Sequence, residues 1–209
     1  MPDMIKITDV TSGQVNTTTA IHLIETEALK SASVKGSLLD DVIEYADTFP
    51  KNLWNIIQRL QLRKFKDNYT QELLRIIVEQ DFEYGFDSPA DLFIKDLLHH
   101  NPTVTREWLN SIFLEYFYDR RILIGLLQIL SHIDYFEIYP QGPTMAVAAL
   151  SHADSEVREC GIRAFENWSN IESLNVLRNL KCPEEWLQEY VQQVISDLEE
   201  ELASHAFAR

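Results

Sequence analysis

The chain has 209 residues, 45% of them hydrophobic, and carries 33 acidic against 18 basic side chains, a formal net charge of −15. This length is sufficient for one well-buried core, and six Gly and seven Pro favour helices over a strand-and-turn architecture. The acidity argues against broad binding to a phosphate backbone, which requires clustered Lys and Arg. It suits a basic protein partner, although a role in solubility explains it equally well.

The cysteine content and the apolar runs bear on the compartment. Two cysteines, Cys160 and Cys182, form no disulfide framework, and we expect both to be reduced, as in a cytoplasmic protein. Residues 1–13 lack the apolar core of a signal peptide, and the longest apolar run, 122–127, is too short to cross a bilayer.

The first fifty residues predict an arm followed by two helices. Residues 1–19 are polar and rich in Thr, and we expect a short extended arm with a strand-like stretch at 4–7. Residues 20–33 follow as a predicted helix. An apolar stripe over 38–46 predicts the next helix, which Pro50 ends.

Residues 51–65 and 68–78 predict two further helices, the second opened by Asn68 and Gln71 as a cap pair. Basic residues gather near the end of the first helix: Arg59, Arg63, Lys64 and Lys66. They complement the helix dipole more simply than they form a nucleic-acid patch. Residues 81–87 are acidic and aromatic but lack the spacing of a calcium loop, and they predict an interhelical loop.

The middle of the chain predicts a helical pair and a central helix. Ser88 and Asp91 open a helix that ends at residues 99–102, with four side chains expected in the core: Leu92, Phe93, Leu97 and Leu98. Residues 105–117 predict its partner, and the apolar segment 119–133 predicts a central helix. Residues 134–142 break the pattern as a packed loop or one short turn. Because no long linker divides the chain, we expect a single domain over 1–209, with divergent helical hairpins over 20–133.

The clearest pattern lies over residues 143–202. Helices are predicted at 143–150 and 154–168, the second with Asp154 as N-cap. Its apolar stripe has helical period: Val157, Cys160, Gly161, Ala164, Phe165 and Trp168. Thirty residues later the same stripe recurs as Leu187, Tyr190, Val191, Val194, Ile195 and Leu198, after a partner helix at 171–180 with Ile171, Leu174, Leu177 and Leu180. Two hairpins with matching stripes indicate an internal repeat.

The repeated segment resembles the core of short HEAT repeats. The residues that carry the resemblance are Asp154, Val157, Arg158, Gly161 and Ala164, in the pattern Asp-x-x-Val-Arg-x-x-Gly-x-x-Ala. The resemblance implies an all-α fold, an irregular α-solenoid of stacked antiparallel helical hairpins. It also implies that Asp154 and Arg158 are structural residues, which bond between neighbouring turns and helices. Gly161 stands where the family usually has Ala, which predicts a closer helix–helix contact.

The resemblance further predicts a binding face, because the second helices of HEAT-like hairpins commonly line the concave side. Glu159 is matched by Glu189 one repeat later, and Arg163 by Gln193. The candidate binding residues are therefore Glu156, Glu159, Arg163, Glu189, Gln193 and Glu200. The acids of the last helix are equally explained as the polar outer face of a terminal repeat.

Catalytic and metal-binding motifs are absent from the sequence. It contains no P-loop, G-x-G-x-x-G, G-x-S-x-G, H-E-x-x-H or C-x-x-C. His99 and His100 are adjacent, and adjacent helical residues point about 100° apart, so we predict no catalytic residue, metal or cofactor.

We therefore expect a non-catalytic module that binds a protein partner, without nucleic acid or membrane. Its size and charge suit an inhibitor of a basic toxin or nuclease, as acidic immunity proteins are. The alternative is an enzyme similar to HEAT-like DNA glycosylases, which use Trp, Arg and Asp in a basic groove. The net charge of −15 has the wrong sign for that groove, and Trp168 belongs to a core stripe.

Overall fold

A computed structural model describes residues 51–79 and 88–207 of the chain. The chain divides into two compact units, residues 1–55 and 56–209. In the first unit only residues 51–55, the start of a helix, are described. The predictions for residues 1–50 and for the loop at 81–87 lie outside the described residues. The single domain over 1–209 consequently stays a prediction.

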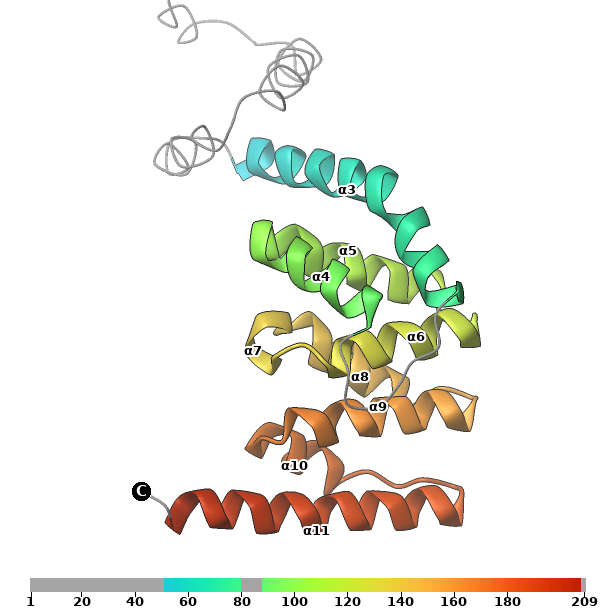
Figure 1. The fold of residues 1–209 in the computed structure, drawn as a ribbon, viewed down its shortest axis with the longest axis vertical. Helices are drawn as coiled ribbons and strands as arrows, with labels where there is room; N and C mark the ends of the chain where they lie inside the picture. Colours follow the sequence, from blue (N-terminus) through green and yellow to red (C-terminus); the bar gives the residue numbers. More distant parts are fainter. Residues whose placement is uncertain (1–50, 80–87, 208–209) are drawn as a thin grey trace, which may run out of the picture. The chain divides into compact units, whose positions relative to one another are not determined.

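The described part of the chain is helical, and no strand occurs within it, which confirms the all-α class (Figure 1). The helices are α3 (Lys51–Glu79), α4 (Pro89–His100), α5 (Pro102–Glu115), α6 (Arg120–Ser131), α7 (Tyr135–Ile138), α8 (Gln141–Ala149), α9 (Ser155–Trp168), α10 (Ile171–Leu177) and α11 (Glu185–Phe207). None of these helices combines the length and the apolar character that crossing a bilayer requires.

The predicted break near Asn68 is wrong, because α3 is one continuous helix. Phe65, Tyr69, Leu73 and Ile77 follow one another at intervals of four residues and pack against or within the core. Asn68 lies on the exposed side of the helix. A cap pair without a following Gly or Pro does not interrupt a helix whose apolar stripe continues through it.

The junction between α4 and α5 is shorter than predicted. Asn101 ends α4 and also begins α5, since its side-chain oxygen accepts a hydrogen bond from the Val104 N–H at 3.3 Å. Pro102 occupies the first turn of α5, where its missing N–H costs nothing.

In α4, the prediction that Leu92 is buried is wrong: Leu92 is 58% exposed and Ile94 occupies the core.

Between α6 and α8 the predicted interruption is confirmed as the single short turn α7. Asp119 caps α6 and Asp134 caps α7, each through carboxylate contacts to backbone N–H groups. Helix α8 begins at Gln141, two residues before the predicted start at Pro143. Pro143 is tolerated there because its N–H would have no partner in the first turn.

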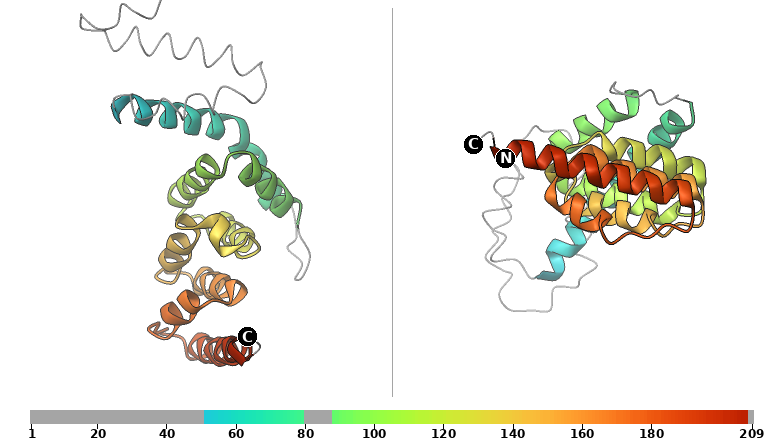
Figure 2. Two further views of the ribbon diagram at one scale, coloured as in Figure 1. Left: turned by 90° about the vertical axis from the view of Figure 1, so that its left-hand side faces the viewer. Right: turned by 90° about the horizontal axis from the view of Figure 1, so that it is seen from below.

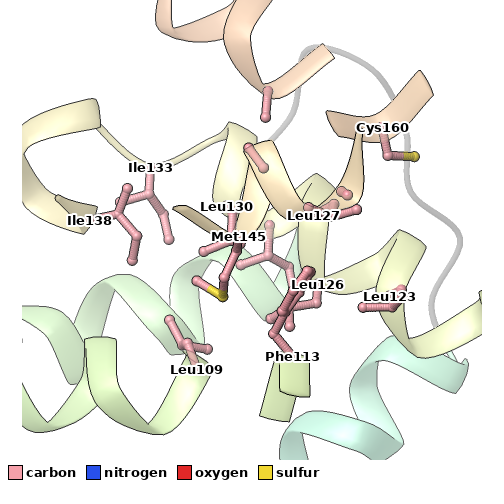
Figure 3. Close-up of a cluster of buried hydrophobic side chains, with 14 of the residues drawn as sticks. Leu109, Phe113, Leu123, Leu126, Leu127, Leu130, Ile133, Ile138, Met145 and Cys160 are labelled. Atoms are coloured by element: carbon pink, nitrogen blue, oxygen red, sulfur yellow. The ribbon is translucent and has the colours of Figure 1, made fainter. Parts of the chain in front are cut away.

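Helix α9 is the best connected helix of the second unit, in contact with α6, α8, α10 and α11. Helices α4 and α6 also contact each other, as do α5 and α8. Leu126, Leu127 and Leu130 on α6 have no exposed surface and form the middle of the core, with Phe113 from α5 and Met145 from α8 (Figure 3). Burial of these side chains provides the main stabilisation of the unit.

Helix α11 is the last described helix and packs against α9 and α10. The right view of Figure 2, from below, shows it lying across this end of the unit. Leu187, Val191, Val194 and Leu198 are buried on its inner side. The partner helix predicted at 171–180 is the shorter α10, in which Leu174 and Leu177 are buried and Ile171 is 51% exposed.

Candidate functional site

The surface formed by α9 and α11 contains the residues predicted to bind a partner. Helix α9 is positioned by Asp154, whose carboxylate Oδ1 accepts hydrogen bonds from the Glu156 and Val157 N–H groups at 2.9 and 3.3 Å. Val157 and Ala164 are fully buried beneath the surface. The apolar stripe therefore fixes one side of α9 in the core and directs the other side outward.

Arg158 ties the start of α9 to the segment that precedes α11. It is buried, and its guanidinium donates to the carbonyl oxygens of His152 and Ala153 at 2.5 and 2.9 Å. The same group is paired with the Glu184 carboxylate. The buried guanidinium thus links the turn before α9 to the residue that precedes α11.

Gly161 lies at a close contact between α9 and α8. A Cβ atom at this position would stand 3.1 Å from the Ala146 carbonyl oxygen, 3.1 Å from Leu150 Cδ2 and 3.2 Å from Ala149 Cβ. The small residue thus allows the two helices to approach closely.

Glu156, at the first turn of α9, is exposed and paired with Arg120 from the start of α6. Arg120 also contacts the second oxygen of Asp154, with an Nε–Oδ2 distance of 3.1 Å. One arginine therefore partly neutralises the acidic start of α9, and this corner is less negative than its sequence alone indicates.

A polar network joins the outward sides of α9 and α11. Arg163 pairs with Glu159 at 2.6 Å, and its guanidinium carbon lies 5.7 Å from the ring centroid of Tyr190 on α11. The Tyr190 hydroxyl donates to the Glu166 carboxylate. Burial raises the pKa of Glu159, and burial together with the bond to Glu166 raises the pKa of Tyr190. The network is half-buried, and its charged groups are paired with one another.

The outer side of α11 is exposed and acidic. Glu189, Gln193 and Glu200 are all exposed there, and the Gln193 amide donates to Asp197 at 2.8 Å. Residues 182–207 contain no Lys or Arg. The segment 151–207 as a whole contains twelve acidic and four basic side chains.

The six predicted binding residues therefore separate into three environments. Glu159 and Arg163 contact each other, Glu156 pairs with Arg120, and the three residues of α11 form a separate acidic strip. Sequence reasoning missed Tyr190 and Glu166, which complete the network, because Tyr190 was assigned to the apolar stripe. Its phenolic oxygen was the available signal, since a half-buried tyrosine requires a hydrogen-bond partner.

A second feature that the sequence did not predict is a cavity of about 680 Å³ among α4, α5 and the turn before α7. It is lined by Lys95, Leu98, His99, Pro102, Arg106, His132, Asp134 and Glu137. His132 Nδ1 donates to the fully buried carboxylate of Asp91 at 3.0 Å. Asp91 also accepts from the Ser88 N–H at 2.6 Å within the capping box of α4.

The histidine–carboxylate pair joins the start of α4 to the end of α6. The cavity lining contains no Ser, Thr or Cys that could serve as a nucleophile. Within residues 51–79 and 88–207, no group of three or more His, Cys, Asp or Glu side chains is arranged to hold a metal ion. The hydrogen bond between His132 and Asp91 connects α6 to α4.

The chain matches no known protein-family model, no curated protein and no solved structure.

Proposed function

We propose that this protein is a non-catalytic module of short HEAT-like repeats, an irregular α-solenoid that binds a basic protein partner. Support for the repeat arrangement comes from the contacts of α9 with both α8 and α11 and from the recurrence of its apolar stripe in α11. The links made by Arg158 and the close contact at Gly161 agree with the roles that the resemblance implies.

The observation that carries the proposal is the segregation of charge. Residues 151–207 have twelve acidic and four basic side chains, whereas residues 88–133 have five acidic and four basic. Solubility alone requires no such segregation. A single-signed surface accelerates the association of an oppositely charged partner and disfavours acidic ones.

The acidic strip of α11, together with the exposed Glu185 at the start of that helix, is the contact region that we propose for the partner. Arg163 lies over the Tyr190 ring of α11 and pairs with Glu159, and Glu156 lies in the first turn of α9. An inhibitor of a basic toxin or nuclease would use such a strip to cover the cationic groups of its target. We propose a cytoplasmic location for this protein, in keeping with its two free thiols, Cys160 and Cys182.

The test is affinity capture on the immobilised protein at low salt, followed by a titration with each purified partner. We expect binding to weaken at least tenfold between about 0.05 M and 0.5 M salt, because exposed charges are screened over these concentrations. A variant with Glu185→Gln, Glu189→Gln and Glu200→Gln should bind at least about tenfold more weakly.

The matched control removes three exposed acids from the other region: Asp96→Asn, Glu107→Gln and Glu115→Gln. This variant has the same net charge as the α11 variant and should retain its affinity for the partner. Equal losses in the two variants, or a complex that is insensitive to salt, would contradict the proposal.

The glycosylase-like alternative has no specific support among the described residues. Trp108 is fully buried and Trp168 is nearly so, with the Trp168 indole N–H donating to the Ile133 carbonyl at 3.1 Å. A gel shift with duplex DNA separates the two functions. Tight binding to DNA at physiological salt would reverse their order.

A further inference from the structure

The cavity among α4, α5 and the turn before α7 has walls of opposite charge. Its basic wall consists of side chains from α4 and α5: Lys95, His99 and Arg106. Its acidic wall consists of Asp134, just before α7, and Glu137 within α7. Leu98 and Pro102 add an apolar part to the lining. The basic wall is exceptional in a chain whose acidic residues outnumber its basic residues by 33 to 18.

The two walls do not neutralise each other. In the part of the chain that the structure describes, no ion pair joins Arg106 to Asp134 or to Glu137. Arg106 is half-buried and donates one N–H to the Glu137 backbone carbonyl oxygen at 3.0 Å. One carboxylate oxygen of Asp134 accepts from the Phe136 N–H at 2.8 Å. The remaining guanidinium N–H groups and carboxylate oxygens are therefore available to a ligand.

His132 belongs to the acidic wall and has a fixed orientation. Its Nδ1 donates at 3.0 Å to the carboxylate of Asp91, which is fully buried and also accepts from the Ser88 N–H. Because Nδ1 carries the proton, the other ring nitrogen, Nε2, is an acceptor. Over residues 51–79 and 88–207, Nε2 has no hydrogen-bond partner. The fixed ring loses little conformational entropy when a donor binds to it.

This arrangement suits a small ligand with one anionic and one cationic end. Arginine binds a carboxylate through paired N–H donors, whereas an ammonium group offers three donors to nearby acceptors. The cavity volume of about 680 Å³ lies within the range of roughly 300–1,000 Å³ that is usual for small-molecule sites. A ligand with a single charge would leave one wall without a partner. Since Arg106 reaches the backbone of α7, the two walls meet at one side, where the closely spaced charges of a single amino acid can bridge them.

We propose that this cavity binds a free amino acid with an apolar side chain. Arg106 binds its carboxylate, and Leu98 packs against its side chain. Asp134, Glu137 and Nε2 of His132 accept from its ammonium group. The site shares no residue with the acidic strip of α11, so this inference goes beyond the proposed protein-binding function and does not depend on it.

The test is a calorimetric titration of the full chain with L-leucine and with two analogues that each lack one charged group. The first analogue, 4-methylpentanoate, has no ammonium group, and the second, 3-methylbutylamine, has no carboxylate. We expect L-leucine to bind at least about tenfold more tightly than either analogue, because only L-leucine contacts both walls. Equal affinity for L-leucine and one analogue would overturn the proposal, as would the absence of L-leucine binding up to about 10 mM.

Variants that remove one charge assign the two walls. Arg106→Gln should abolish the preference for L-leucine over 3-methylbutylamine, because the carboxylate loses its partner. Asp134→Asn combined with Glu137→Gln should abolish the preference over 4-methylpentanoate. Asn at position 134 retains the side-chain oxygen that caps α7, so the turn is preserved. Unchanged preferences in these variants would overturn the assignment of the walls.

The matched controls are Arg63→Gln and Asp67→Asn, which remove one charge of each sign from exposed positions on α3 outside the cavity lining. Both should bind L-leucine as the unchanged protein does, and thermal melting of all variants monitors folding. Losses of affinity in the controls as large as those in the cavity variants would overturn the site. The α11 charge variant should also retain its affinity for L-leucine, so its effect on a protein partner tests the proposed function separately.

Discussion

The segment from α4 to α6 and the segment from α9 to α11 contact each other but use their polar residues differently. In residues 88–133 the formal charges nearly balance, and the fully buried Asp91 is held by Ser88 and His132. In residues 151–207 acids outnumber bases threefold, and three of the four basic side chains, Arg158, Arg163 and Arg178, are paired with acids. The first segment is thus stabilised by apolar packing, and the second also by ionic links that leave an acidic surface.

The largest expected effect concerns Cys160, which lies where the two segments meet (Figure 3). Burial raises the pKa of its thiol from 9.0 to about 12. Because only the thiolate reacts, alkylation at about pH 8 should be roughly a thousandfold slower in the folded protein than in denaturant. Mass spectrometry of the alkylated peptides measures this ratio. A rapid reaction of native Cys160 would show that the contact between the two segments is accessible to solvent.

The same shift predicts a dependence of stability on pH. The folded-state pKa lies above the unfolded value, so its contribution is fully present below about pH 9 and is lost as the pH rises toward 12. Replacement by Ser, with no comparable thiol to titrate, should flatten this part of the stability profile.

In the balanced segment, Phe113→Ala should lower the free energy of unfolding by about 4 kcal/mol, because it opens a cavity in the core. The loss should be the same at low and high salt, since no charge is involved. Denaturant titration at two salt concentrations measures it. A loss of stability that changes strongly with salt would show that charge interactions also stabilise the balanced segment.

In the acidic segment, Arg158→Ala should cost about 3 kcal/mol, because it leaves Glu184 half-buried without its cation. The double variant with Glu184→Gln should recover part of this loss, which a double-mutant cycle measures. If the two losses simply add, the pair does not tie α9 to α11.

A smaller effect is expected at the network between α9 and α11. Tyr190→Phe removes the hydroxyl that donates to Glu166 and should lower the free energy of unfolding by about 1 kcal/mol. The ring beneath Arg163 is retained, so Phe keeps the cation–π contact. An unchanged free energy of unfolding in chemical denaturation would show that this hydrogen bond does not stabilise the segment.

The smallest stability effect belongs to the exposed strip. The α11 variant with three Glu→Gln replacements should change the free energy of unfolding by less than about 0.5 kcal/mol, since the replaced side chains are exposed. Its expected loss of partner affinity would then report on binding alone. A large change in the melting temperature would show that these acids are structural.

Sequence reasoning succeeded where a pattern is local. The apolar stripes of α9 and α11, the apolar helix α6, the caps at Ser88 and Asp154, and the short turn α7 all follow from periodicity and side-chain chemistry. It failed at Leu92, which was expected in the core yet is 58% exposed. A stripe shows which side of a helix is apolar, but the width of the neighbour decides how much of it is covered.

The sequence by itself determined that the described chain is helical, that acids outnumber bases threefold over residues 151–207 and that α9 and α11 share one pattern, because these properties depend on residues close together in the chain. Only the tertiary structure decided which of those acids are paired, that Asp91 meets His132, and that Phe136, Tyr139 and Ile171 are exposed. Pairing and exposure depend on distances between residues tens of positions apart, which are set by how the helices pack.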